Sequence, residues 1–222
     1  MIDTEFLFRD LDGHLALWCG ADAVGGDLAA MAERAVAAKM PVMSVVPDAV
    51  DTVWPWLEKT NVDISARFYL DNFSDAYDAV SDLAARINRA FRRGAGGVQI
   101  FVRARDMDAL ARAIRPVRDD LFFNKELAVG TDIGEIDACE WGGVFDALGR
   151  MNASRFVLAH AVDAGAKSDF VGRVYGMLDT RWAWRGGIDF VLGDNAPRID
   201  QAWRLVHDMR PDLAENVRFF IS

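Results

Sequence analysis

An eightfold repeat constrains the fold of this sequence more than any other feature. In each unit a short run rich in β-branched and aromatic residues, with strand-like alternation, is followed by a segment with helical spacing of its apolar residues. Because strands and helices alternate throughout, the sheet is expected to be parallel, with right-handed crossovers. The expected strands are 14 to 20, 41 to 48, 62 to 70, 97 to 103, 121 to 129, 154 to 161, 188 to 193 and 217 to 222.

Eight such units in 222 residues predict an α/β protein with one (β/α)₈ barrel domain that covers residues 1–222. An open doubly wound sheet would show the same alternation and is the alternative. Asp12 and Gly13 form a hairpin signal, so an extra N-terminal strand is expected before the first barrel strand. Since the sequence stops soon after the eighth expected strand, the last helix is expected to be missing.

In this periodicity the sequence resembles the compact (β/α)₈ (TIM) barrel metabolic enzymes, which include aldolases, phosphosugar isomerases and decarboxylases of small acids. Residues 18 to 20 read Trp-Cys-Gly, which is similar to the Cys-Gly on the first strand of phosphoribosylanthranilate isomerases. The resemblance implies a lyase or an isomerase. One departure separates it from phosphosugar enzymes, because residues 193 to 197 read Gly-Asp-Asn-Ala-Pro and no eighth phosphate-binding loop follows.

Charge and composition exclude several classes of partner. A formal net charge of -9 argues against nucleic acid and against an anionic membrane surface as a general partner. No apolar run reaches the roughly 18 residues needed to span a bilayer, and the acidic start does not resemble a signal peptide. The expected location is therefore the cytoplasm, where Cys19 and Cys139 would stay reduced.

The direction of each side chain follows from the period of two along a strand. The outer side of a barrel strand packs under helices and must be apolar, whereas the inner side can be polar near the C-terminal mouth. Applied to strands two to five, this rule predicts that Asp48 and Ser65 face inward, together with the polar set of the candidate site: Ser44, Arg67, Tyr69, Asp71, Gln99, Arg103, Asn124 and Glu126.

This inward set predicts a binding site for a small anionic metabolite. Arg67 and Arg103 would hold the anion, and Glu126 would act as the general base. The remaining members would orient the substrate or the base: Ser44, Tyr69, Asp71, Gln99 and Asn124. The alternative is an internally paired polar layer in a non-catalytic barrel, which would serve as a binding or assembly module and could form a homo-oligomer.

A second enzymatic alternative is a Schiff-base aldolase that uses Lys125. A Schiff base needs a desolvated amine with a lowered pKa, and Lys125 is the one lysine within an expected strand. The same parity that turns Glu126 inward turns Lys125 toward the helices, unless a bulge redirects it.

Histidines and carboxylates bear on metals and proton transfer. A multi-histidine metal site is not expected, because only His160 lies at the end of a strand, and no cofactor is required. Its parity favours a structural histidine, with proton transfer as the alternative. Mg²⁺ is left open, since four carboxylates could meet at a narrow mouth: Asp48, Asp71, Glu126 and Asp194.

Overall fold

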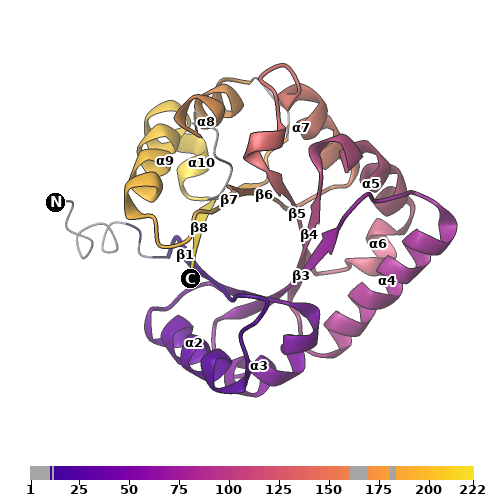
Figure 1. Ribbon diagram of the computed structural model, residues 1–222, viewed down its shortest axis with the longest axis vertical. Helices are drawn as coiled ribbons and strands as arrows, with labels where there is room; N and C mark the ends of the chain where they lie inside the picture. Colours follow the sequence, from indigo (N-terminus) through magenta and orange to yellow (C-terminus); the bar gives the residue numbers. More distant parts are fainter. Residues whose placement is uncertain (1–10, 12, 161–169, 181–183) are drawn as a thin grey trace.

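A computed structural model describes residue 11 and residues 13–160, 170–180 and 184–222. Its eight strands form a closed barrel in sequence order (Figure 1). Every strand is parallel to its neighbours, and β8 closes the ring on β1. The predicted TIM-type (β/α)₈ barrel is confirmed, and the open-sheet alternative is wrong because an open sheet would leave two strands with unpaired edges.

The strands are short, and helices or helical turns connect them. The strands are β1 (Leu15–Trp18), β2 (Val42–Val45), β3 (Asp63–Leu70), β4 (Gly97–Val102), β5 (Glu126–Asp132), β6 (Arg155–Ala159), β7 (Gly187–Val191) and β8 (Val217–Ile221). The α-helices are α2 (Gly25–Ala37), α3 (Val50–Leu57), α4 (Tyr77–Arg92), α5 (Met107–Ile114), α6 (Arg118–Leu121), α7 (Trp141–Arg150), α8 (Phe170–Asp179), α9 (Ala196–Met209) and α10 (Pro211–Ala214). Four 3-10 turns, η1 (Pro47–Ala49), η2 (Ala104–Asp106), η3 (Arg115–Val117) and η4 (Ile133–Glu135), complete the connections.

Two details differ from the expected chain path at the ends of the sequence. The expected N-terminal strand falls on residues 1–10, which lie outside the described residues. The described segments contain nine α-helices, so their number does not indicate a missing last helix. After β8 only Ser222 follows in the sequence.

Strand five begins later than the sequence pattern predicts. Leu121 ends α6, and the chain then turns at Asn124, whose φ of 53° lies in the left-handed region that an extended strand cannot contain. β5 therefore runs from Glu126 to Asp132 instead of from 121 to 129. Asn124 and Lys125 therefore lie outside the sheet. The strand extends three residues further toward its C-terminal end, to Asp132.

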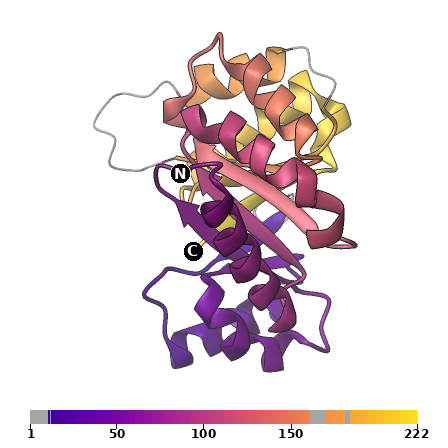
Figure 2. The ribbon, with the colours of Figure 1, turned by 90° about the vertical axis from the view of Figure 1, so that its right-hand side faces the viewer.

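The main hydrophobic core lies between the sheet and the surrounding helices (Figure 2). Outward-facing aromatic residues of four strands are fully buried in it: Phe68, Phe156, Phe190 and Phe219. Burying an aromatic side chain of this size stabilises the fold by about 1.5–3 kcal/mol. The outward face of the barrel is therefore committed to packing, and chemistry is left to the interior and the two ends.

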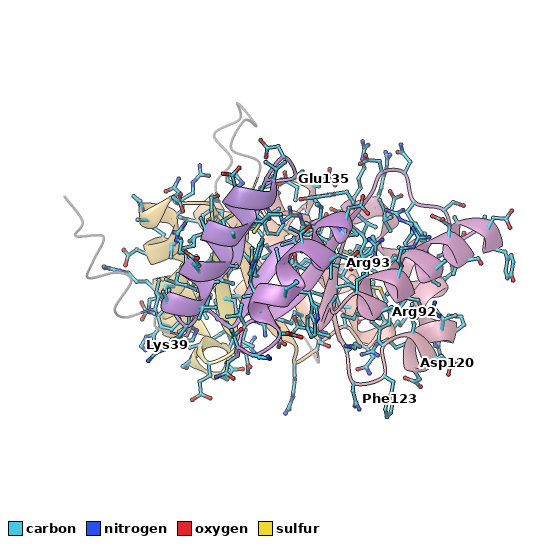
Figure 3. All side chains as sticks on the ribbon, turned by 90° about the horizontal axis from the view of Figure 1, so that it is seen from below. Lys39, Arg92, Arg93, Asp120, Phe123 and Glu135 are labelled. Carbon is cyan, nitrogen blue, oxygen red and sulfur yellow. The ribbon has the colours of Figure 1, made fainter. Side chains whose placement is uncertain are left out.

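The two ends of the barrel are chemically different. Loops that leave the strands form the C-terminal mouth, and loops that enter the strands close the N-terminal end. Figure 3 shows Glu135 at one face of the ring, with Phe123 and Lys39 at the opposite face. Within the described segments, no helix is both long and apolar enough to cross a membrane.

Candidate active site

A cavity of about 380 Å³ opens at the C-terminal mouth, above the ends of β3 to β7. Active sites of (β/α)₈ enzymes form at this end because several loops converge there on a rigid ring of strands. The ionisable and polar side chains that line the cavity are Tyr69, Asp71, Arg103, Thr131, Asp132, Glu135 and His160.

His160 and Asp132 are two ionisable residues that line this cavity. β6 ends at Ala159, so His160 is the first residue beyond the strand, and it is 9% exposed. Burial lowers the pKa of His160, and nearby Arg198 lowers it further, whereas Asp132 opposes the shift. The imidazole is therefore largely neutral at pH 7, the state that a general base requires.

Asp132 is held in place by its own backbone turn. It ends β5 and precedes the 3-10 turn η4, where its carboxylate accepts a hydrogen bond of 2.7 Å from the Gly134 N–H. The same turn carries Glu135, whose Oε2 accepts a bond of 3.1 Å from the Ala104 N–H. This second bond joins the loop after β5 to the loop after β4 and fixes one wall of the cavity.

Arg103 and Asp71 lie on the exposed rim of the cavity. Arg103 follows the last residue of β4, and Asp71 follows the last residue of β3. Both side chains are exposed, so each can move toward a ligand. Tyr69, which is 53% exposed, lies below them with its ring 5.2 Å from that of Phe101.

Below the aromatic rings, the barrel interior contains a buried arginine. Arg67 is 2% exposed, and its Nη2 donates to the Cys19 carbonyl at 2.5 Å. Its Nη1 donates at 3.2 Å to the Ser44 hydroxyl, which in turn donates to Gln99 Oε1 at 2.6 Å. The guanidinium carbon lies 3.8 Å from the centre of the Trp18 ring, a cation–π contact. Burial lowers the pKa of Arg67.

Four charged side chains form an ion cluster at the N-terminal end of the interior. Asp189 is completely buried and accepts from Arg155 at 2.7 Å and from Arg218 at 2.8 Å. Arg218 also donates to Glu126 at 2.8 Å. The two arginines hold the pKa of Asp189 below its usual range despite its burial. Two cations and two anions thus balance within the cluster.

The ion cluster corrects the expected arrangement of the site. Glu126 begins β5 at the N-terminal end, where it pairs with Arg218 and not with Arg67 or Arg103. Asn124 is exposed in the turn before β5 and does not enter the barrel. The expected arginine fork is also divided, because Arg67 is buried in the interior while Arg103 is exposed at the rim. The structure brings together Ser44, Arg67 and Gln99 inside, and Tyr69, Asp71 and Arg103 at the mouth.

Lys125 lies at the end opposite the mouth. Its amine donates to the Ala95 carbonyl at 3.0 Å and lies 5.4 Å from the centre of the Phe91 ring, under α4. The other two described lysines, Lys39 and Lys59, precede β2 and β3 and so lie at the same end. Lys167 is outside the described residues.

The four carboxylates considered for Mg²⁺ do not converge. Glu126 is at the N-terminal end, and Asp48 lies outside the barrel on the turn after β2, 3.7 Å from Arg93. Asp194 accepts from the Ser222 N–H. Within the described ranges, no group of three or more His, Cys, Asp or Glu side chains is placed to hold a metal ion.

The sequence pattern missed three residues of the mouth: Thr131, Asp132 and Glu135. The expected strand ended at 129, so these positions fell into a connecting loop. A signal was present, since Asp132 followed by Gly134 is typical of a side chain that caps a turn. Parity predicts that His160 faces the helices; its ring lies 5.5 Å from that of Phe170 in α8, and the residue also lines the cavity at the mouth.

Comparisons with known proteins support the fold. No family model matches the sequence, and no curated protein matches it. A candidate deoxyribose-phosphate aldolase from Toxoplasma gondii ME49 is 16% identical with a TM-score of 0.71, and the match covers 98% of this chain and 90% of that one. The tetrameric deoxyribose phosphate aldolase from Aeropyrum pernix is 10% identical with a TM-score of 0.69, covering 99% and 94%.

This protein is a TIM-type (β/α)₈ barrel. A candidate copper homeostasis protein from Streptococcus agalactiae is also similar, with a TM-score of 0.62, 9% identity and coverage of 93% of this chain and 96% of that one. Proteins with different described roles therefore share the fold, and function has to be argued from the site.

Proposed function

We propose that this protein is an enzyme of the lyase or isomerase class, which acts at the C-terminal mouth on a small anionic metabolite by general acid/base chemistry. The observation that carries the proposal is a histidine with a lowered pKa in a cavity at the mouth, beside a carboxylate that is fixed by its own turn. Titratable groups with perturbed pKa values in a concave site are typical of catalytic residues.

In the proposed reaction His160 removes a proton from the carbon next to a carbonyl group of the substrate. The electron pair of the broken C–H bond moves onto the carbonyl oxygen, and Asp132 stabilises the resulting imidazolium. In an isomerase whose substrate carries a hydroxyl group on the deprotonated carbon, the hydroxyl proton moves to the enolate oxygen and the imidazolium protonates the former carbonyl carbon, so that the carbonyl group changes position. A lyase instead uses the electron pair to expel a leaving group from the next carbon, and the imidazolium protonates that group.

Two arginines support an anionic substrate, although three acidic side chains, Asp71, Asp132 and Glu135, also line the cavity. Arg103 lies on the rim of the cavity, and Arg67 lies beneath its floor without a carboxylate partner among the described residues. A cation in a low-dielectric interior attracts an anion far more strongly than the same cation in water. The two arginines therefore keep their predicted role in this proposal, one at the rim and one below the aromatic floor.

The Schiff-base alternative requires an amine at the mouth. All described lysines lie at the N-terminal end, so Lys125 would have to act on a substrate outside the barrel. The structural similarity to aldolases is a reason to test this alternative. Borohydride reduction in the presence of oxo-acids or aldehydes, followed by peptide mass analysis, would detect a trapped adduct on any lysine.

The direct test is solvent deuterium exchange followed by NMR. A panel of small oxo-acids, hydroxy acids and their phosphate esters is incubated in D₂O, and loss of a C–H signal next to the carbonyl reports proton abstraction. We expect exchange with wild type and at least a hundredfold slower exchange with His160→Gln, because a positioned base contributes about 10²- to 10⁴-fold.

Two variants at the opposite end serve as matched controls. Lys125→Met and Glu126→Gln change ionisable groups of the N-terminal end, so both should exchange at the wild-type rate. Equal exchange by wild type and His160→Gln would contradict the role of His160. A reduced adduct on Lys125 would replace the acid/base mechanism with the Schiff-base one.

A further inference from the structure

The barrel interior holds a compact group of polar atoms that are not hydrogen bonded within the described part of the chain. They are Ser65 Oγ, Arg67 Nε and Gln99 Nε2, each on a side chain that is at least 98% buried. Parallel pairing places Arg67 directly beside Gln99, and Ser65 is the next inward residue of β3. Each unsatisfied buried polar group costs about 1–3 kcal/mol, so three in one place indicate a site for a polar guest.

The charge of this group is also unbalanced. The hydrogen-bond and cation–π partners of Arg67 are a carbonyl, a hydroxyl and aromatic rings, and no described carboxylate forms an ion pair with it. Buried charges in proteins are normally paired, as those of the ion cluster at the other end are. The guest that would complete the layer is therefore an anion.

The available donors fit a carboxylate. The Nε–H of Arg67 has no hydrogen-bond partner among the described residues, and the Gln99 amide and the Ser65 hydroxyl offer further donors to carboxylate oxygens beside it. A phosphate dianion suits this end of the barrel less well, because three acidic side chains line the cavity above: Asp71, Asp132 and Glu135. Like charges at the entrance disfavour a doubly charged ligand more than a singly charged one.

Aromatic rings separate this layer from the cavity at the mouth. Phe101 lies 5.2 Å from the Tyr69 ring and 5.7 Å from the Trp18 ring, measured between ring centres. Phe101 occupies space that a side chain on β5 would fill, because a Cβ on Gly130 would lie 2.4 Å from its ring. Tyr69 is half exposed. These two rings form the boundary that a ligand must displace to reach Arg67.

We propose that Arg67, Gln99 and Ser65 form a carboxylate subsite beneath the Tyr69–Phe101 pair, and that the anionic metabolite of the mouth is a monocarboxylate whose carboxylate enters this subsite. The inference rests on the proposed function for the identity of the ligand as substrate. The subsite itself stands on the buried cation and the three unsatisfied polar atoms.

The first test observes Arg67 directly in wild type, so it does not depend on a variant that folds. Protein labelled with ¹⁵N-arginine is titrated with pyruvate, glyoxylate and acetate, and with inorganic phosphate and sulfate for comparison. We expect the Arg67 Nε–H resonance, assigned by its loss in Arg67→Lys, to shift with the carboxylates. An Nε–H resonance that no carboxylate moves, or that only phosphate and sulfate move, would overturn the subsite.

Thermal denaturation provides the second test. A carboxylate that binds only the native state raises the Tm of wild type, and its apparent affinity for Arg67→Met should be weaker by about thirtyfold or more. Arg105→Met is the matched control, since Arg105 is an exposed arginine near the rim that bonds to Asn72, and its carboxylate affinity should equal that of wild type. Equal loss in both variants would indicate general charge attraction and overturn the subsite.

The two proposals fail in different ways. Carboxylate binding that persists in His160→Gln, with no deuterium exchange in any variant, would leave the subsite in place and remove the proposed reaction. Deuterium exchange that is unchanged in Arg67→Met would leave the reaction in place and overturn the assignment of the substrate carboxylate to Arg67.

Discussion

The two polar layers inside the barrel differ in how their charges are balanced. At the N-terminal end, Asp189 has two arginine partners, and its side chain is 0% exposed. In the layer below the mouth, Arg67 is nearly as buried but has no carboxylate partner within the described segments. Both layers consist of inward-facing residues of the same sheet, so the difference lies in the side chains and not in the backbone.

This difference separates a structural role from a binding role. A balanced cluster needs no additional group, and removing one member leaves a buried charge without its partner. A buried cation without an ionic partner lowers the free energy of unfolding of the ligand-free protein. It also favours the binding of an anion that reaches it. We therefore propose that the ion cluster at the N-terminal end stabilises the fold and that the layer below the mouth binds a ligand.

Replacing Asp189 tests the balanced layer and should have the largest effect. Asp189→Asn leaves Arg155 and Arg218 with one carboxylate between them, and that carboxylate, Glu126, is partly exposed. We expect the free energy of unfolding to fall by about 3–5 kcal/mol, as measured by urea denaturation. A loss below about 1 kcal/mol would mean that the cluster does not act as a charge-balanced unit.

A steric clash with the ion cluster should have the second-largest effect on the free energy of unfolding. A Cβ on Gly187 would lie 2.3 Å from Arg155 Nη1, so Gly187→Ala displaces that guanidinium from Asp189. We expect a loss of about 1–3 kcal/mol in the same measurement. Gly142→Ala is the matched control in helix α7, where no atom lies within 4 Å of the added Cβ, and it should be neutral or slightly stabilising. Similar losses for both glycines would contradict the steric explanation.

Charge removal from the unbalanced layer should change the free energy of unfolding much less. Arg67→Met deletes a buried cation while keeping much of its apolar volume, and the lost bonds to Cys19 and Ser44 offset part of the gain. We expect the free energy of unfolding without ligand to stay within about 1 kcal/mol of wild type. A loss comparable to that of Asp189→Asn would place Arg67 among the structural residues and remove the contrast between the layers.

The smallest expected effect is a pH dependence at the mouth. The folded state lowers the pKa of His160 below its ordinary value of 6.5, so the unfolded chain binds the proton first as the pH falls. The contribution of neutral His160 to the free energy of unfolding is therefore fully present above about pH 6.5. It decreases below that pH, by at most about 1.4 kcal/mol for each unit of the pKa shift. Denaturation midpoints of wild type and His160→Gln between pH 7.5 and 5 should converge as the pH falls. Parallel curves would contradict the lowered pKa.

The sequence was a good guide to regular structure, because a buried strand face imposes a period of two. That period turned Arg67, Gln99 and Glu126 inward, as the structure has them. It could not give the height of each residue along the barrel axis, because the stagger between strands depends on closure of the whole sheet. For this reason Glu126 was grouped with Arg67, although its partner Arg218 comes from β8, 92 residues away.

The other errors arose at strand ends. Asn124 leaves the extended conformation through a positive φ, so strand parity does not apply to it. Asp132 is positioned by a capping turn whose local signal lay beyond the expected strand. The site is built largely from such terminal residues, and boundaries are the part of a pattern that sequence fixes least.

The ion cluster has a kinetic consequence for any reaction above it. Among the described residues, the ion cluster occupies the N-terminal end of the interior and a cavity opens at the mouth, so we expect ligands to enter and leave by the mouth. A lyase whose active site opens at one end only would release its two products in order. The product nearest the solvent would leave first, and the product bound at Arg67 would leave last. Product inhibition patterns would then be asymmetric: the deeper product would compete with the substrate, and the outer product would not.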